Sequence, residues 1–489
     1  MEIFQFYCII ILLKIINSSN NQIYKIKFGL FNLRQNETDL SLINNIYYNR
    51  LYLNLSIGTP PQNIPFMLDI ESQTFLVSND FFNPNKSESY ERISIGEVYY
   101  KYEDVISGFN SKDILNINSI YNNKDNTKKI NFILGKGTRI PSKEKDNFGL
   151  LGLRIPKKVQ YGVYPFFHSL KSAELINSFT WTLKYFDNIS LFDQITYNKN
   201  GENIIGEFIF GDKPSAYEQD KNKYDETEFY EINTIPNSKN DNYFFWDIEF
   251  NNFFLSFKNK NKTIDYYYYG EKVQIVINLS FILCSSSFFE FLKKNFFNEF
   301  LSNKICSEKK FDYYYYYIEC NSDLDIESFP DISLESRGFR TIFNLTYKDL
   351  FIKDEKNNKY IFLMFSSSFY PGNSWALGTP FLRKYQFVFN EDSRTIGYYR
   401  NNNRKNDNNN LKELNKTKKI KTTLIIFLIV IFSVLFTIFG MIIQRKFFNK
   451  NRKMRANELE ENFSYEGKNN NEDKKIIKDD KEISSYYNL

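Results

Sequence analysis

Apolar and polar residues alternate along residues 46–400 in short runs that turn-forming residues interrupt. A period of two residues is typical of β-strands, whose side chains point to the two faces of a sheet in turn. Apolar residues with helical spacing are rare, and the clearest cases cover residues 165–176 and 288–300. The pattern therefore predicts an all-β fold class, mainly β with a few short helices.

Two longer apolar segments lie near the ends of the chain. Residues 4–16 are short and almost wholly apolar, so we interpret residues 1–19 as a cleaved signal peptide. Residues 422–443 carry no charged side chain and have about the length of a helix that crosses a bilayer. We therefore expect a single-pass type I membrane protein of the secretory and endomembrane system or the cell surface. Its folded part would be lumenal or extracellular, and residues 444–489 would form a cytosolic tail.

The chain has 489 residues, of which 42% are hydrophobic, and this is enough to fill the cores of two lobes. We place an N-terminal lobe in residues 46–225 and a C-terminal lobe in residues 226–400. A polar stalk over residues 401–421 would join the lobes to the membrane helix. The 63 basic and 58 acidic residues leave a net charge of +5, which argues against nucleic acid as a partner.

The sequence offers few residues for metal binding or for a Ser-His triad. It contains one histidine, His168, and four cysteines. This set is too small for most zinc sites, and a triad would have to use His168, whose neighbours favour the surface of a helix. We therefore expect no metal and no other cofactor.

Several short motifs follow one another in a characteristic order. Residues 51–62 end in Gly-Thr-Pro-Pro-Gln and lead into an apolar strand that ends at Asp69. Residues 149–153 read Gly-Leu-Leu-Gly-Leu, and residues 375–380 read Trp-Ala-Leu-Gly-Thr-Pro. This series resembles the pepsin-like aspartic protease family, peptidase A1, in a plasmepsin-like and membrane-anchored form. The resemblance implies a bilobal fold with a substrate cleft between two barrel-like lobes.

The resemblance also implies where the catalytic acids should lie. Proteases of this family hydrolyse peptides with two aspartates that share one proton. The first is assigned to Asp69. The family follows this aspartate with a hydroxyl residue and a glycine, but here Ile70 and Glu71 follow it. A glutamate at the glycine position is expected to disturb the loop.

The second aspartate should fall within residues 273–283, and no acid lies anywhere in residues 273–289. The strand pattern leaves two candidates for the partner position, Ile277 or Asn278. Neither side chain can take up and release a proton near neutral pH, so neither can act as a general acid or base. The catalytic site is therefore predicted to be degenerate.

Two further features are implied by the resemblance. The flap that covers the substrate normally carries a tyrosine, and Tyr100 and Tyr102 straddle its expected position, which makes them candidate substrate-binding residues. Cys306 and Cys320 lie where the family usually has a disulfide in the second lobe, and they should pair in an oxidising lumen. Cys284 has no obvious partner.

Three functions remain open on this reading. We favour a degenerate homologue that binds a peptide or protein ligand in the interlobe cleft, because the motifs of the fold survive while both site motifs are broken. The alternatives are an active aspartic-type endopeptidase, which would use Asp69 with an unconventional second acid such as Glu71, and a surface structural glycoprotein. Glycosylation sequons occur at Asn36, Asn85, Asn188, Asn261 and Asn344. Asn278 also begins a sequon, which should go unused in a buried strand.

Overall fold

The computed structural model forms two compact units, Met1–Arg404 and Lys405–Leu489. Every described residue belongs to the first unit. The described ranges are 22–32, 41–94, 98–100, 106–117, 128–137, 148–156, 164–187, 204–220, 222–235, 243–257, 262–266, 271–311, 314–367 and 375–400. The predicted signal peptide, stalk, membrane helix and tail lie outside these ranges. Within them, no helix combines the length and apolar character that a membrane span requires.

The first lobe is organised around one large sheet of 14 strands. Strand β2 shows how the sequence pattern produces it, since buried and half-buried residues alternate along the whole strand. The sheet contains β1 (Tyr24–Asn32), β2 (Asn49–Ile57), β3 (Gln62–Asp69), β4 (Phe75–Ser78), β5 (Glu91–Arg92), β6 (Val98–Tyr100), β7 (Ile106–Asn116), β8 (Lys129–Gly137), β9 (Gly149–Gly152), β11 (Thr180–Tyr185), β12 (Ile204–Phe210), β13 (Phe229–Asn233), β28 (Phe387–Asn390) and β29 (Thr395–Tyr399).

The second lobe contains a sheet of 9 strands and a separate sheet of 4 strands. The larger sheet contains β15 (Asp247–Phe250), β18 (Glu271–Ile275), β19 (Ile282–Cys284), β20 (Cys306–Phe311), β21 (Tyr315–Asn321), β24 (Phe351–Asp354), β25 (Lys359–Phe362), β26 (Met364–Ser367) and β27 (Trp375–Leu377). The smaller sheet contains β16 (Asn252–Phe257), β17 (Lys262–Tyr266), β22 (Asp331–Ser336) and β23 (Thr341–Leu345). A short pair joins β10 (Ile155–Pro156) to β14 (Tyr243–Phe244).

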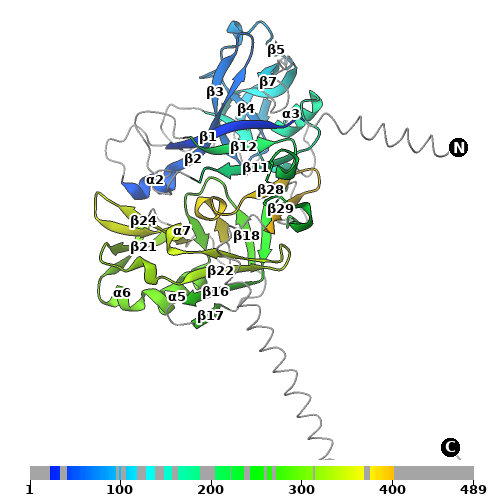
Figure 1. The fold of residues 1–489 in the computed structure, drawn as a ribbon. Helices are drawn as coiled ribbons and strands as arrows, with labels where there is room; N and C mark the ends of the chain where they lie inside the picture. Colours follow the sequence, from blue (N-terminus) through cyan, green and yellow to red (C-terminus); the bar gives the residue numbers. More distant parts are fainter. Residues whose placement is uncertain are drawn as a thin grey trace, which may run out of the picture. The chain divides into compact units, whose positions relative to one another are not determined.

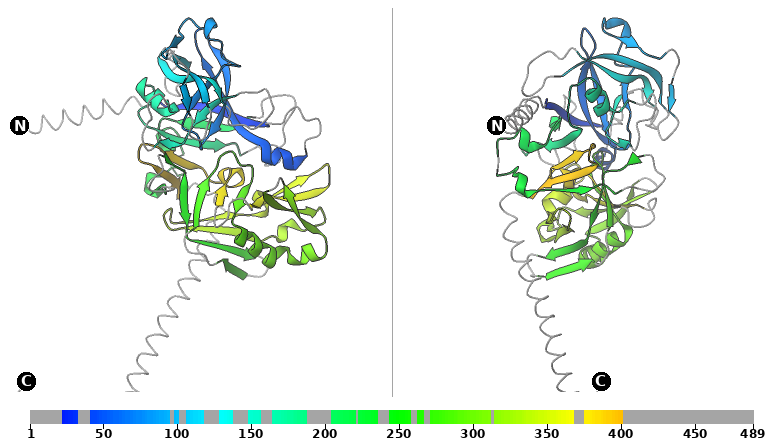
Figure 2. Two further views of the ribbon diagram at one scale, coloured as in Figure 1. Left: turned by 180° about the vertical axis from the view of Figure 1, so that it is seen from behind. Right: turned by 90° about the vertical axis from the view of Figure 1, so that its right-hand side faces the viewer.

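The last two strands of the described chain return to the sheet of the first lobe. β28 pairs with β11, and β29 pairs with both β28 and β13. In Figures 1 and 2 these orange strands lie where the two lobes meet. Trp181 of β11 stacks on Phe389 of β28 with ring centroids 4.0 Å apart, and Trp246 donates from its indole to the Leu153 carbonyl at 2.9 Å. The two lobes therefore share both a sheet and a hydrophobic core.

The helices are short, as the sequence pattern predicts. The segment 165–176 contains α3, and the segment 288–300 lies within α5, a π-helical turn η6 and α6. The N-terminus of α5 is capped by Ser285, whose hydroxyl accepts a bond from the Phe288 N–H. The α-helices are α2 (Leu42–Tyr48), α3 (Phe166–Ser172), α5 (Ser286–Leu292), α6 (Asn298–Ser302), α7 (Tyr347–Leu350) and α8 (Thr379–Leu382). Single turns occur at η2 (Pro84–Lys86), η3 (Pro214–Ala216), η4 (Glu226–Glu228), η6 (Lys293–Phe297) and η7 (Ile326–Ser328). The predicted mainly β, bilobal fold is confirmed.

Candidate active site

Strand β3 carries Asp69 into the interior of the first lobe. It runs parallel to β9, and Asp69 pairs with Gly152. Gly152 leaves no room for a side chain, because an added Cβ would lie 2.5 Å from the Thr74 backbone nitrogen. This close packing around Gly152 keeps Asp69 buried, with only 5% of its surface exposed.

The loop after Asp69 tolerates the two unusual residues that follow it. Ile70 is buried and Glu71 is exposed. The backbone N–H of Glu71 still donates to Asp69 Oδ1 at 2.9 Å. Ser72 is buried, and its hydroxyl accepts from the Thr74 N–H at 3.1 Å. The glutamate at the glycine position is therefore accommodated by exposure of its side chain, and the Asp69 carboxylate retains a backbone donor.

The pairing of β3 with β9 in the first lobe can be compared with the pairing of β18 with β27 in the second. The comparison asks which residue of the second lobe corresponds to Asp69. In the first lobe Leu68 pairs with Leu151, and the next pair is Asp69 with Gly152. In the second lobe Ile275 pairs with Leu377, and Val276 is the next residue. The N–H of Val276 donates to the Leu377 carbonyl at 3.0 Å, which continues the same ladder.

The neighbouring strands support the same count. Leu76 pairs with Leu150 in the first lobe, and Leu283 pairs with Ala376 in the second. Leu76 follows Asp69 by as many residues as Leu283 follows Val276. By this count Val276 is opposite the position of Asp69. The Leu153 N–H donates to the Asp69 carbonyl, however, whereas the corresponding Thr379 N–H donates to the Leu279 carbonyl. The assignment of the partner position to Ile277 or Asn278 therefore stays a prediction. Val276 and Ile277 are buried, and none of the three residues is an acid.

Asn278 joins the second lobe to the strand that carries Asp69. Its Oδ1 accepts from the Leu51 N–H at 3.1 Å, and its Nδ2 donates to the Leu68 carbonyl at 2.6 Å. Leu68 directly precedes Asp69. The Asn278 amide therefore joins the two lobes beside Asp69 through one accepted and one donated hydrogen bond. This role needs a side chain with both a donor and an acceptor.

A cation that the sequence analysis did not single out lies close to Asp69. Arg50 is half-buried at the start of β2, and its Nη1 donates to the Tyr47 and Asn49 carbonyls at 2.8 and 2.9 Å. Burial lowers the pKa of the Arg50 guanidinium, and this is opposed by Tyr47 and by the carboxylates of Asp69 and Glu71. Arg50 precedes the motif at residues 51–62, but nothing in the local pattern indicates that β2 turns it toward the acids.

Aromatic side chains connect α2 to the second lobe beside this site. The Tyr47 ring lies 4.8 Å from Phe311, 5.4 Å from Tyr315 and 6.4 Å from Phe281, measured between ring centroids. Phe311 and Tyr315 face each other across the β20–β21 hairpin. Residues 313–317 are five consecutive tyrosines, and Tyr315 of this run thus packs against the first lobe.

Residues 98–100 and 106–116, where the flap is predicted, form two strands that pair with each other. β6 pairs with β7, with Tyr100 opposite Ile106. Tyr102 lies outside the described residues. The second strand of the hairpin, β7, is anchored by Asp113, which is fully buried and accepts a hydrogen bond from the Ser87 hydroxyl at 2.8 Å. The position of Tyr100 in this hairpin is compatible with the predicted role, which stays a prediction.

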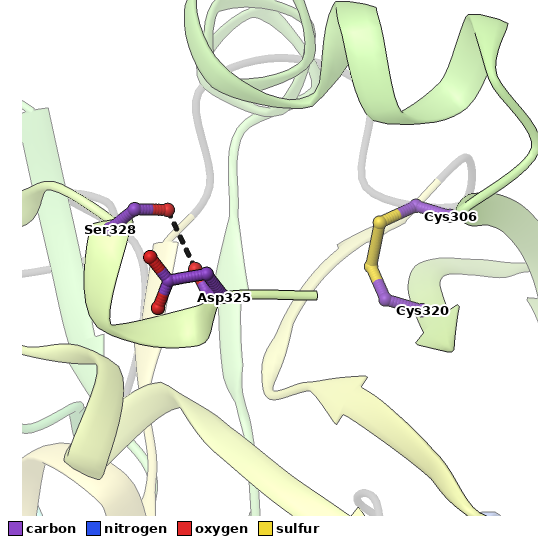
Figure 3. Close-up of a disulfide and its surroundings, with 4 residues drawn as sticks. All are labelled: Cys306, Cys320, Asp325 and Ser328. Carbon is purple, nitrogen blue, oxygen red and sulfur yellow. Dashed lines mark hydrogen bonds between the residues drawn. A yellow bond between two sulfur atoms is a disulfide. The ribbon is translucent and has the colours of Figure 1, made fainter. Parts of the chain in front are cut away.

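The predicted disulfide is confirmed. Cys306 and Cys320 are bonded and lie directly opposite each other on β20 and β21. Figure 3 shows the bond near the turn where the Ser328 hydroxyl donates to the Asp325 carbonyl at 2.6 Å. Cys284 is buried and is not part of this disulfide. Within the part of the chain that the structure describes, no group of three or more His, Cys, Asp or Glu side chains could hold a metal ion.

The fold and the paired loops around Asp69 and Val276 define a pepsin-like bilobal protein. The model of the eukaryotic aspartyl protease family matches residues 50–208 and 281–400, and the chain belongs to this family. It is also similar to a renin of Ovis aries, with 22% identity over 382 residues, covering 74% of this chain and 83% of that renin. A renin of Echis ocellatus is 23% identical over 376 residues, with the same shares covered. The second matched segment begins at residue 281, after Val276, Ile277 and Asn278.

Proposed function

We propose that this chain is a degenerate pepsin-like protein that binds a peptide or protein ligand in the cleft between its lobes without hydrolysing it. The observation that carries the proposal is the absence of an acid at Val276, Ile277 and Asn278. Hydrolysis needs one carboxylate to accept a proton from water while its partner donates one to the peptide carbonyl. Asp69 by itself cannot perform both transfers.

The surroundings of Asp69 support this proposal. Both polar ends of the Asn278 amide are used in bonds to the first lobe, so this side chain is committed to joining the lobes. The guanidinium of Arg50 adds a fixed positive charge near Asp69. The family's mechanism needs a second acid beside this aspartate, and the charge that Arg50 supplies is of the opposite sign.

An active aspartic-type endopeptidase is the alternative, with Glu71 as the second acid. It is favoured by the position of Glu71, whose N–H bonds to Asp69 and whose charge acts on Arg50 together with that of Asp69. Against it, Glu71 is exposed while Asp69 is buried. A shared proton requires two carboxylates held in contact and shielded from bulk water.

The proposed location is the lumenal or extracellular side of a membrane, with residues 422–443 as the anchor. The disulfide between Cys306 and Cys320 supports an oxidising compartment, because such bonds are rare in the cytosol. A structural glycoprotein of the cell surface is compatible with the same location. No observation favours that role over a ligand-binding cleft.

Cleavage assays with the purified full-length protein test the proposal. We expect no hydrolysis of denatured protein or mixed peptide substrates between about pH 4 and 7, where paired carboxylates of this family share a proton. The Asp69→Ala variant should give the same background. The proposal fails if pepstatin-sensitive cleavage appears and is lost in Asp69→Ala. Loss of such cleavage in Glu71→Gln, with the protein still folded, would favour the alternative.

A further inference from the structure

The structure distinguishes among the glycosylation sequons that lie in its described part. These begin at Asn54, Asn85, Asn278 and Asn344. Asn278 uses both ends of its amide to bridge the lobes. Asn344 is half-buried in β23, its Oδ1 accepts from the Ser333 hydroxyl at 2.7 Å, and its N–H donates to the Tyr385 hydroxyl. Asn54 is half-buried in the middle of β2, between β1 and β3.

Asn85 differs from these residues in every respect that matters for a bulky attachment. It lies in the single turn η2, between β4 and β5, and it is exposed. Its backbone N–H donates to Asn83 Oδ1 at 3.0 Å, and its side-chain amide makes no hydrogen bond to any described residue. A sugar on its amide nitrogen would extend into solvent without breaking a bond of the fold.

We propose that Asn85 carries an N-linked oligosaccharide when the chain enters the secretory lumen. In the transfer, a bond forms between Asn85 Nδ2 and C1 of the first sugar of a polyprenyl-pyrophosphate-linked oligosaccharide. The bond from C1 to the phosphate oxygen breaks, the pyrophosphate leaves with its bonding electrons, and the amide loses one proton. The inference depends on the lumenal location proposed above.

The hydroxyl of this sequon shows when the transfer must take place. Ser87 Oγ donates to Asp113 Oδ2 at 2.8 Å and accepts from the Thr59 N–H at 3.0 Å. Asp113 is fully buried beneath it. Since the acceptor sequence must be open to the transferase, the sugar is added before β7 brings Asp113 to Ser87. Folded, unglycosylated protein would be a poor acceptor.

The glycan would not obstruct the cleft. Figure 1 shows β5, the strand that follows η2, at the end of the first lobe that is farthest from the second lobe. The neighbouring turn is fastened by Gln62, whose side chain bonds to the Asn83 carbonyl at 3.0 Å and to its N–H at 2.9 Å. The modification is therefore compatible with ligand binding between the lobes.

Expression of the full-length chain in eukaryotic secretory cells tests the inference. Glycopeptide mass spectrometry should find an oligosaccharide on Asn85 that an amidase specific for N-linked glycans releases. Asn85→Gln should remove one glycan, whereas Asn344→Gln should leave the glycan number unchanged. Occupancy of Asn344 or Asn54 together with an empty Asn85 would overturn the inference.

A second variant separates failure at this site from failure of lumenal delivery. Phe81→Ser creates a new sequon at Asn79, within the exposed turn at residues 79–81 of the same lobe. A glycan on Asn79 with Asn85 empty overturns the inference and leaves lumenal delivery intact. If neither asparagine is modified, the inference and the proposed lumenal location both fail.

Discussion

At the scale of single residues, the side chain of Asn278 joins the second lobe to the strand that carries Asp69. Its amide accepts from one strand and donates to another, and the acceptor of its N–H is the Leu68 carbonyl beside Asp69. A carboxylate at this position has no hydrogen to donate near neutral pH. Restoring an acid at Asn278 would therefore remove a contact between lobes without supplying a catalytic partner.

We expect Asn278→Asp to lower the free energy of unfolding by about 1–3 kcal/mol, because the Leu68 carbonyl loses its donor and faces a negative charge. Urea unfolding measures this loss, and the variant should show no protease activity. Asn79→Asp, on an exposed turn, should unfold like the wild type. Unchanged stability of Asn278→Asp, or new pepstatin-sensitive cleavage by it, would contradict this account of the site.

At the scale of elements, two charged pairs fasten α3 to the turn between β28 and β29. His168 Nε2 lies 3.0 Å from Glu391 Oε1, and Lys171 Nζ lies 3.1 Å from Asp392 Oδ1. Glu391 is 7% exposed, and burial raises its pKa, which the bond to His168 opposes. The sole histidine of the chain therefore pairs with a buried acid, while the neighbouring pair is exposed.

The raised pKa of Glu391 makes this attachment depend on pH. The folded state retains a proton on Glu391 at pH values where the unfolded chain, with an ordinary pKa of about 4.3, has lost it. Stability from this group is therefore present at acidic pH and falls as pH rises through the folded-state pKa.

We expect the stability of the wild type, relative to Glu391→Gln, to decrease as pH rises above about 4.3, the ordinary pKa of a glutamate, because the folded state holds the Glu391 pKa higher. Thermal unfolding at several pH values measures this difference. Lys171→Met serves as a matched control on the same helix, because it removes the exposed pair with Asp392 and leaves Glu391 in place. A difference that is constant with pH, or that grows as pH rises, would refute the assignment.

At the scale of the whole molecule, the two lobes are not independent. The C-terminal strands β28 and β29 belong to the sheet of the first lobe, and Phe389 packs on Trp181 in its core. The membership of the eukaryotic aspartyl protease family rests on this architecture and on the matched segments. Removal of β28 and β29 should therefore destabilise the first lobe, although these strands are far from the rest of that lobe in sequence.

We expect a chain that ends at residue 386 to lose the cooperative unfolding of both lobes, because Trp181 and the edge of β11 would face water. A chain that ends at residue 400 keeps β28 and β29 and is the matched control. Calorimetry and limited proteolysis compare the two. Survival of a protease-resistant first lobe in the shorter chain would show that the shared sheet contributes little to its stability.

The linear sequence was sufficient for the mainly β fold class, the two lobes, the positions of α3 and α5–α6 and the Cys306–Cys320 pair. These depend on local periodicity or on motifs whose residues are close together in the chain. It was also sufficient to show that residues 273–289 contain no acid. That conclusion needs no three-dimensional information.

Other features were decided only by tertiary structure. A strand pattern with period two does not specify register to a single residue, so the sequence left Ile277 and Asn278 open, and the pairing of β18 with β27 adds Val276 as a third candidate. Arg50 approaches Asp69, and Asn278 reaches Leu68, through contacts between segments far apart in sequence. The sequons look alike as sequence, and folding alone separates exposed Asn85 from Asn278 and Asn344, because burial and hydrogen bonding of an amide are properties of the packed chain.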